Sequence, residues 1–270
     1  MLRNEGDRLR RVVVCTPRSE YFNVSDLKAQ NINEVADTDA TIRQHDTLKS
    51  TMEAFCCEVV DVPELSGHPN SVFTRDVSLV TPRGYIKLRM GLEARRGEET
   101  WMADVLESLD IPFVGEIALP GTVEGGDVIL AGTVAFVGQS SRTNEEGIRQ
   151  LSALLTDMGY EVRTVPVKRN FLHIGGVMSA VGPERIVCCR EDFPEGFFRG
   201  FDTVDVPWDG PSSGNVICLA ENEVIANPAE NMETIRMLEA NGVNVHAVDL
   251  SEFRKGAGGP TCLILPVNRY

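Results

Sequence analysis

The chain has 270 residues, enough for one large domain or two small ones. Its hydrophobic share of 42% and charged share of 24% are those of a globular protein, which excludes a disordered chain. Lys and Arg number 26 against 40 Asp and Glu, so the net charge of −14 (26 − 40) disfavours nucleic acid and anionic membranes as partners and favours a small cationic molecule.

The seven cysteines are scattered, and no pair has the spacing of a zinc site or of a disulfide framework. We therefore expect no metal and no cofactor. No apolar run is long enough to span a membrane, and the N-terminal segment MLRNEGDRLRR lacks the apolar core of a signal peptide. The sequence predicts a cytoplasmic protein with no membrane partner, and it leaves a homo-oligomer open.

Two hydrophobic periods alternate along the chain. Runs of period 2 predict strands at residues 11–15, 58–62, 72–80, 85–88, 127–130, 134–137, 161–166, 174–181, 185–189, 216–219, 224–226, 243–248 and 261–265. Runs of helical period predict helices at residues 39–55, 97–109, 144–158, 192–200 and 229–240. Gly159 and Gly242 follow two of these helices, where a left-handed C-terminal cap favours glycine.

The predicted elements repeat in the order strand, strand, helix, strand. The repeats start near Val72, Glu124, His173, Asn215 and Thr261. Their spacing, roughly 40 to 55 residues, is typical of propellers and other repeat folds. The N-terminal strand and helix would complete the last copy. The sequence thus predicts one α/β catalytic domain over residues 1–270, a five-module ββαβ propeller with pseudo-fivefold symmetry closed by its terminal strands; a doubly wound sheet is the alternative.

Four of the modules open on residues that carry chemistry. These are Asp76 in FTRD, Glu124 in VEGGD, His173 in LHIGG and Cys262 in GGPTC. Equivalent positions of propeller modules line one rim of the central axis, so we expect these four side chains to meet in one pocket. Each residue alone is a weak signal, because a single Asp is usually a turn residue and a lone His is usually structural.

Together the four residue types suit attack on a guanidinium group. Carboxylates can hold the planar cation through paired, charge-assisted hydrogen bonds. A thiolate can attack its central carbon, and a neighbouring His can protonate the departing amine and then activate water. No metal is required for this chemistry. A peptidase-type Cys–His pair is the rival interpretation, but a neutral peptide carbonyl would gain nothing from two negative charges.

The sequence resembles the guanidine-modifying superfamily, the pentein fold, which contains dimethylargininases, arginine deiminases and amidinotransferases. The resemblance is densest in HPNSVFTRD, ARRGEET, GTVEGGD, VGQSSRTNEEG, FLHIGG and SEFRKGAGGPTCLILPVNR. It implies a small cationic guanidino substrate, Cys262 as nucleophile, His173 as general acid and base, and Glu124 with Asp76 around the guanidinium. It also implies that Arg95 and Arg142 bind the substrate carboxylate.

Within the superfamily, GTVEGGD, SSRTNEEG and SEFRKGAGG are most similar to a bacterial dimethylargininase. Dimethylargininases usually carry acidic residues at the positions of Asn70 and Arg75, however, and these two candidate substrate-binding residues resemble arginine deiminase. Arginine deiminases and amidinotransferases place an Asp two residues after the His, where this chain has Gly175. A glycine leaves room for methyl groups on the substrate.

The sequence therefore predicts a hydrolase that cleaves a guanidino C–N bond of N-methylated arginine through a covalent Cys262 intermediate, giving citrulline and a methylamine. The first alternative is an arginine deiminase acting on free arginine to release ammonia. Further alternatives are an amidinotransferase and a non-catalytic propeller that binds a partner. We also note that the loop at residues 18–26 could fold over the site.

Overall fold

The computed structural model describes residues 1–168 and 171–270. Its strands form five sheets of three strands each. In every sheet the first two strands pair antiparallel, as a hairpin in four of the sheets, and the third strand pairs parallel to the second. The sheets are β3 (Ser78–Thr81), β4 (Gly84–Lys87), β5 (Phe113–Glu116); β6 (Val128–Ala131), β7 (Val134–Gln139), β8 (Glu161–Pro166); β9 (Met178–Gly182), β10 (Arg185–Cys188), β11 (Asp202–Asp205); β12 (Ile217–Ala220), β13 (Glu223–Ala226), β14 (Asn244–Ala247); and β15 (Leu265–Arg269), β1 (Leu9–Cys15), β2 (Glu58–Val62). This is the predicted five-module ββαβ propeller.

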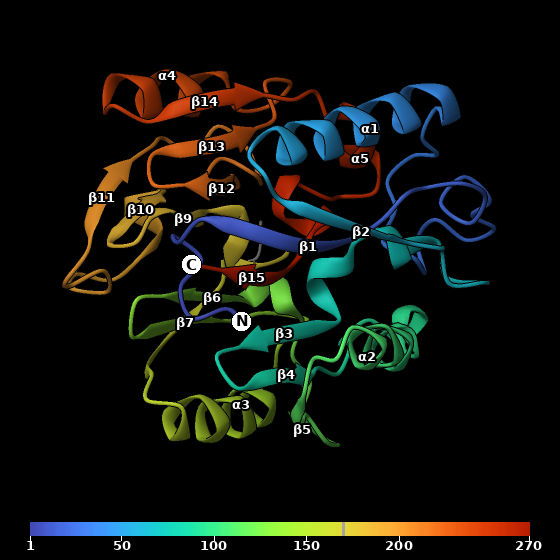
Figure 1. Ribbon diagram of the computed structural model, residues 1–270, viewed down its shortest axis with the longest axis horizontal. Coiled ribbons are helices and arrows are strands. Elements are labelled where there is room, and N and C mark those ends of the chain that lie inside the picture. Colours follow the sequence, from blue (N-terminus) through green and yellow to red (C-terminus); the bar gives the residue numbers. More distant parts are fainter. Residues whose placement is uncertain (169–170) are drawn as a thin grey trace.

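A parallel third strand needs a crossover connection, and a helix supplies it in four modules. These helices are α1 (Thr38–Ala54), α2 (Glu98–Ser108), α3 (Glu145–Asp157) and α4 (Met232–Ala240), while a short α5 (Ser251–Lys255) precedes β15. They lie at the periphery of the molecule (Figure 1). Gly159 and Gly242 follow α3 and α4 with φ of +89° and +78°, which confirms the predicted glycine caps.

The helix predicted at residues 192–200 is wrong. In the third module a 3-10 turn at Arg190–Asp192 and further turns link β10 to β11, and the described chain has no α-helix there. Pro194 and Gly196 interrupt the helical period, and Gly196 has a φ of +76°. The phenylalanines of this segment instead pack as an aromatic cluster on Phe136 of β7.

Burial falls from the first strand of each sheet to the third. The strands β3, β6 and β9 are buried along their whole length, whereas β2, β5 and β14 contain no buried residue and each includes exposed ones. The first strands therefore line the central axis, and the third strands lie outside, under the helices. Because β15 pairs with β1, the two ends of the chain meet in the fifth module, as Figure 1 shows.

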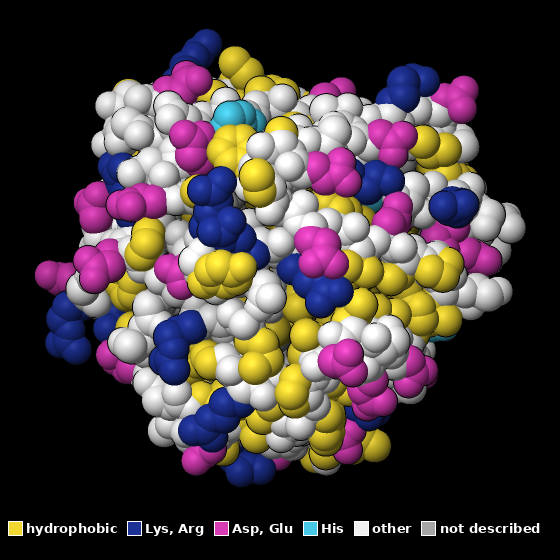
Figure 2. All heavy atoms as spheres, in the orientation of Figure 1, with side chains coloured by type: hydrophobic (Ala, Val, Ile, Leu, Met, Phe, Trp, Pro, Cys, Tyr) yellow, Lys and Arg dark blue, Asp and Glu magenta, His cyan; other side chains and the backbone are white. Residues whose placement is uncertain are grey.

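The surface mixes both signs of charge. Figure 2 shows acidic and basic side chains interspersed on the face viewed. The longest helix, α1, has 17 residues, and no helix within the described ranges is long and apolar enough to cross a membrane.

Candidate active site

The residues that carry chemistry lie in, or directly before, the 3-10 turns that precede the axial strands. Asp76 ends the turn Thr74–Asp76, and Cys262 lies within the turn Pro260–Leu263. Glu124 and His173 each come directly before such a turn. The strands predicted from residues 72, 174 and 261 therefore start later than expected, since the polar residues and glycines at their beginnings form turns. These turns contact one another around the axis, so the structure brings all four residues together.

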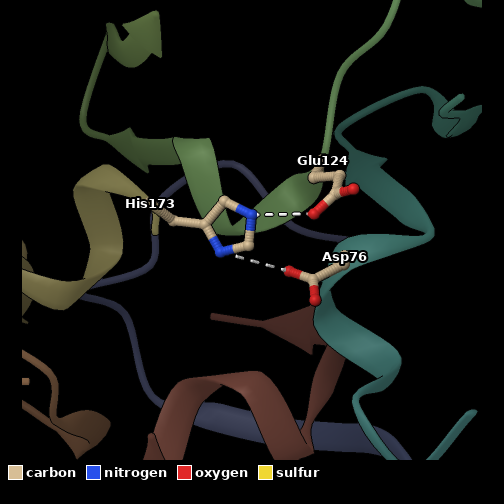
Figure 3. A group of neighbouring side chains, drawn as sticks. All are labelled: Asp76, Glu124 and His173. Carbon is tan, nitrogen blue, oxygen red and sulfur yellow. Dashed lines mark hydrogen bonds and ion pairs between the residues drawn. The ribbon is translucent and has the colours of Figure 1, made fainter. Parts of the chain in front are cut away.

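His173 lies between two carboxylates, as Figure 3 shows. Its Nε2 is 2.9 Å from Glu124 Oε2, and its Nδ1 is 3.9 Å from Asp76 Oδ1. Burial alone would lower the pKa of His173, but the charges of Asp76, Asp127 and Glu124 raise it to about 9. At neutral pH His173 is therefore an imidazolium that can donate a proton.

Glu124 is fully buried, and its carboxylate interacts with several hydrogen-bond donors. Its Oε1 accepts hydrogen bonds from the backbone amides of Gly91 and Leu92, at 3.1 Å each. The guanidinium of Arg142 lies 3.4 Å from the same oxygen. Burial would raise the pKa of Glu124, but His173 and the neighbouring arginines hold it well below its ordinary value. Glu124 is thus a carboxylate with both oxygens held in place, Oε1 by the two backbone amides and Oε2 by His173.

Arg95 is tied to protein groups. Its Nη1 donates to Asp76 Oδ2 at 2.6 Å, and its Nε donates to Glu98 Oε2 at 2.8 Å. Its Nη2 donates to the carbonyl oxygens of Phe73 and Asn70, at 3.0 and 3.4 Å. The resemblance implies that Arg95 binds a substrate carboxylate, but in this structure the guanidinium fixes the position of Asp76.

Arg142 lines a narrow pocket of about 20 Å³ together with Leu92, Gln30 and Asn31. Cys262 and His173 line the same pocket. Asn70 donates from Nδ2 to the carbonyl oxygen and to Oε1 of Gln30, at 2.9 and 3.0 Å. Residues 30–31 line this pocket, Asn70 holds them in place, and the loop at 18–26, which could have folded over the site, is not among the lining residues.

Cys262 is partly exposed. It lines both the narrow pocket and a wider cavity next to it. The amide of Gly259 points to its Sγ at 3.4 Å. Burial and the charge of Asp76 raise the pKa of Cys262 to about 11, while Gly259, Arg95 and Arg254 act in the opposite direction. The thiol is therefore mostly protonated at pH 7.

Arg75 does not join the other predicted site residues. Its Nη2 donates to Glu5 Oε1 at 2.8 Å and to the carbonyl oxygen of Val128, and its Nε donates to that of Gly125. It lines a separate small pocket along the propeller axis. Asp76 and Arg75 are neighbours in sequence, but their side chains point to opposite ends of that axis.

Three further polar residues lie at the site and were not predicted from the sequence. Asp127 accepts hydrogen bonds from Ile174 N at 3.0 Å and Ser140 Oγ at 2.6 Å, and burial raises its pKa to about 6. Asn215 and Arg254 line the wider cavity. Asn215 opens the fourth module, so the repeat itself could have indicated it. Arg254 has no counterpart in the other modules, and its charged side chain resembles an ordinary surface residue in the sequence.

Asp76, Glu124 and His173 offer ligand atoms within 4.8 Å of one another, a spacing that suits a metal ion. Their surroundings favour protons and guanidinium groups instead. Arg95 and Arg142 already neutralise the two carboxylates, and an imidazolium has no free lone pair for a metal. The expectation of a metal-free site stays a prediction.

The chain is similar in sequence to several known proteins. A family model described as eukaryotic N,N dimethylarginine dimethylhydrolase matches residues 19–269. The N(G),N(G)-dimethylarginine dimethylaminohydrolase of Pseudomonas aeruginosa is 30% identical over 224 residues, which cover 83% of this chain and 87% of that protein. The arginine deiminase of Listeria monocytogenes is 25% identical over 253 residues, covering 74% of this chain and 62% of that protein.

Among solved structures, a cysteine-to-serine variant of the Pseudomonas aeruginosa enzyme in complex with citrulline matches with a TM-score of 0.83. The match has 27% sequence identity and covers 97% of this chain and 100% of the other.

Proposed function

The chain belongs to the N,N-dimethylarginine dimethylhydrolase family, and we propose that it converts N-methylated arginine and water to citrulline and a methylated amine. It is accordingly a hydrolase that acts on a carbon–nitrogen bond of a linear amidine. The membership confirms the guanidine-modifying superfamily predicted from the motifs. One observation carries the proposal: a partly exposed thiol shares a pocket with an imidazolium that lies between two carboxylates.

In the proposed reaction the substrate guanidinium binds beside Asp76. Asp76 Oδ1 accepts from Gly126 N at 3.1 Å and Oδ2 accepts from Arg95, which leaves lone pairs for the substrate. Arg142 binds the α-carboxylate of the substrate. The pocket around Arg142 has room for about one water, so Gln30 and Asn31 move when an amino acid enters.

Cys262 attacks the central guanidino carbon after its proton leaves to solvent. The arriving cation lowers the cost of forming the thiolate, which burial and Asp76 otherwise oppose. The C–N bond then breaks, and His173 protonates the departing amine, as its pKa of about 9 allows. Water attacks the remaining carbon–sulfur adduct, His173 takes a proton from that water, and the C–S bond breaks to release citrulline.

Gly175 supports a methylated substrate. A side chain at this position would begin 2.9 Å from the carbonyl oxygen of Gly126, and no other group lies within 4 Å of that point. The pocket has neither charge nor bulk there, so methyl groups on the distal nitrogen meet no obstruction. Free arginine is the second candidate substrate, supported by the arginine deiminase similarity.

A citrulline assay with arginine, monomethylarginine and asymmetric dimethylarginine in parallel tests the proposal. We expect kcat/KM for a methylated arginine at or above that for arginine. Turnover of arginine alone would replace methylarginine by arginine as the substrate, and turnover of none of the three would overturn the proposed function. The substitution Gly175→Asp is a weaker test than its position suggests, because the new Cβ would force the Gly126 backbone to shift.

A further inference from the structure

A second cavity lies on the other side of the reactive groups. It has a volume of about 370 Å³, opens to solvent, and shares Cys262 and His173 with the narrow pocket. Its remaining wall includes Gly175, Ser212 and Arg254. At ~30 Å³ for each water, the cavity has room for about a dozen waters. Dimethylamine, the amine released from dimethylarginine, has three non-hydrogen atoms and would leave most of this space unused.

The lining of the wide cavity lacks negative charge. Among its lining residues in the described chain there is no Asp or Glu, although the protein as a whole carries a net charge of −14. The charged side chains among these described lining residues are His173 and Arg254. Their carboxylate partners lie outside the lining, so the groups that face the cavity are donors, and these favour an anionic or acceptor group in its occupant.

Arg254 is held in place while part of its guanidinium stays available. Its Nη1 donates to Ser212 Oγ at 3.1 Å, and its Nε forms an ion pair with Glu230, which lies outside the lining. No hydrogen bond involves its Nη2 in the described structure. The charge of Arg254 also reaches the thiol, since it acts to lower the pKa of Cys262. Arg254 is therefore a preoriented cation within electrostatic reach of the reacting carbon.

Asn215 adds neutral donors to the same wall. It is buried, and its Oδ1 accepts hydrogen bonds from the backbone amide and the hydroxyl of Thr261, at 2.9 and 3.1 Å. With its acceptor oxygen occupied, Asn215 can offer the N–H groups of Nδ2 to an occupant. Arginine and amide donors on one wall form a site for a carboxylate.

We propose that the wide cavity binds a carboxylate-bearing substituent on the departing nitrogen, so that the substrates include Nω-carboxyalkyl arginines. This inference rests on the proposed function and specifies its substrate class. The amino-acid arm lies toward Arg142, the guanidino carbon lies at Cys262, and the substituent passes Gly175 toward Arg254. For Nω-carboxymethylarginine the balance is one water consumed, the distal C–N bond broken, and citrulline and glycine released, with His173 protonating the glycine nitrogen.

The test compares kcat/KM for Nω-carboxymethyl-L-arginine and asymmetric dimethylarginine in the wild type and in Arg254→Gln. We expect the wild type to use the carboxymethyl compound at least as well as the dimethyl compound. Loss of a charge-assisted bond should lower kcat/KM for the carboxymethyl compound about 10- to 100-fold more than for the dimethyl compound. Arg254→Lys, which keeps the charge, should restore part of this selectivity. Arg236→Gln on the exposed face of α4 is the matched control and should change neither value.

Two results would overturn the inference: turnover of dimethylarginine without turnover of the carboxymethyl compound, or equal losses for both substrates in Arg254→Gln. Equal losses would mean that Arg254 binds the amino-acid arm or acts only on the thiol. A binding measurement separates this inference from the proposed function. In a Cys262→Ser background, Nω-carboxymethylarginine should bind more weakly once Arg254→Gln is added, whether or not dimethylarginine is a substrate. Unchanged binding would also overturn the inference.

Discussion

The two ends of the propeller axis each hold buried charges and a cysteine, yet only one end leaves its cysteine partly exposed. At the far end, Arg75 and Arg269 are bound to Glu5 and to backbone carbonyls, and Cys218 donates its S–H to the carbonyl oxygen of Ala220 at 3.2 Å. At the end that holds the proposed active site, Cys262 is partly exposed and its sulfur faces the amide of Gly259. The thiol of Cys218 therefore donates a hydrogen bond, whereas the sulfur of Cys262 accepts one.

The comparison shows that the thiol pKa alone does not identify the nucleophile. Burial raises the pKa of both Cys218 and Cys262 to about 11. What differs is access and the direction of the neighbouring dipoles. A substrate cation can reach Cys262 and favour its thiolate, whereas Cys218 is only 2% exposed and faces carbonyl oxygens that oppose ionisation.

The largest expected effect comes from exchanging sulfur for oxygen at the two ends. Cys262→Ser should lower kcat by a factor on the order of 10⁴ or more, because a serine hydroxyl ionises far less readily than a thiol. Cys218→Ser should keep kcat within about threefold and affect mainly the free energy of unfolding. A citrulline assay with circular dichroism on both variants measures this. Near wild-type activity in Cys262→Ser would refute the proposed nucleophile.

The next effect concerns the imidazole between the carboxylates. His173→Gly should lower kcat by about 10²- to 10⁴-fold, since both proton transfers lose their donor or acceptor. His246 forms a similar pair with Glu223 at the periphery, with Nε2 and Oε2 2.7 Å apart, so His246→Gln is the matched control. The pre-steady-state burst of released amine measures the first half-reaction, and the steady-state rate measures complete turnover. Unchanged kinetics in His173→Gly would make the residue structural.

Arginines at the two ends should respond differently. Arg142→Gln should raise KM for an amino-acid substrate by about 10- to 100-fold, because a charge-assisted bond to the α-carboxylate is lost. Arg75→Gln should lower the free energy of unfolding by about 3–5 kcal/mol, because Glu5 keeps a buried charge without its partner, and the folded variant should keep its KM. Kinetics together with denaturant unfolding separate the two roles, and a higher KM in Arg75→Gln would contradict the assignment.

A smaller effect is the pH dependence. The rate of iodoacetamide labelling at Cys262 should rise about tenfold per pH unit below its pKa of about 11, while Cys218 in the folded protein should stay unlabelled. The pKa of His173 is raised above its unfolded value of 6.5. Its contribution to stability is therefore fully present below about pH 6.5 and is lost as the pH rises through about 9. Unfolding curves at pH 7 and 10 should show this loss in the wild type and not in His173→Gln, and an equal loss in both would contradict the pKa.

The smallest expected effect is that of a chelator. Since arginines neutralise Asp76 and Glu124, dialysis against EDTA should leave kcat/KM within twofold of its starting value. A loss that added Zn²⁺ or Mg²⁺ restores would show that the rim holds a metal ion.

The fold was largely predictable because its hydrophobic periods repeat five times. The predicted strands at residues 58–62 and 161–166 match β2 and β8, and four of the five predicted helices are present. The errors lie where turn residues override the period. Pro194 and Gly196 prevent the helix that was expected in the third module. The polar turns directly before the axial strands continue the pattern of those strands in the sequence, so the predicted strands begin too early.

The convergence of Asp76, Glu124, His173 and Cys262 was predictable because equivalent module positions share one rim. Side-chain direction was not, since Arg75 and Asp76 are sequence neighbours that point to opposite ends of the axis. Arg95 donates hydrogen bonds to two acidic side chains of the protein. Glu98 is one helical turn away in sequence, but only the fold places Asp76 beside Arg95. Arg254 escaped prediction because nothing in the sequence distinguishes it from a surface arginine.

In the proposed mechanism, Cys262 forms a covalent bond to the guanidino carbon during turnover. Acid quenching of wild-type protein with asymmetric dimethylarginine, followed by peptide mass spectrometry, can detect this bond. We expect a mass increase on the peptide that contains Cys262, absent in Cys262→Ser and absent from the Cys218 peptide. An adduct on another residue, or citrulline formation at full rate in Cys262→Ser, would contradict it.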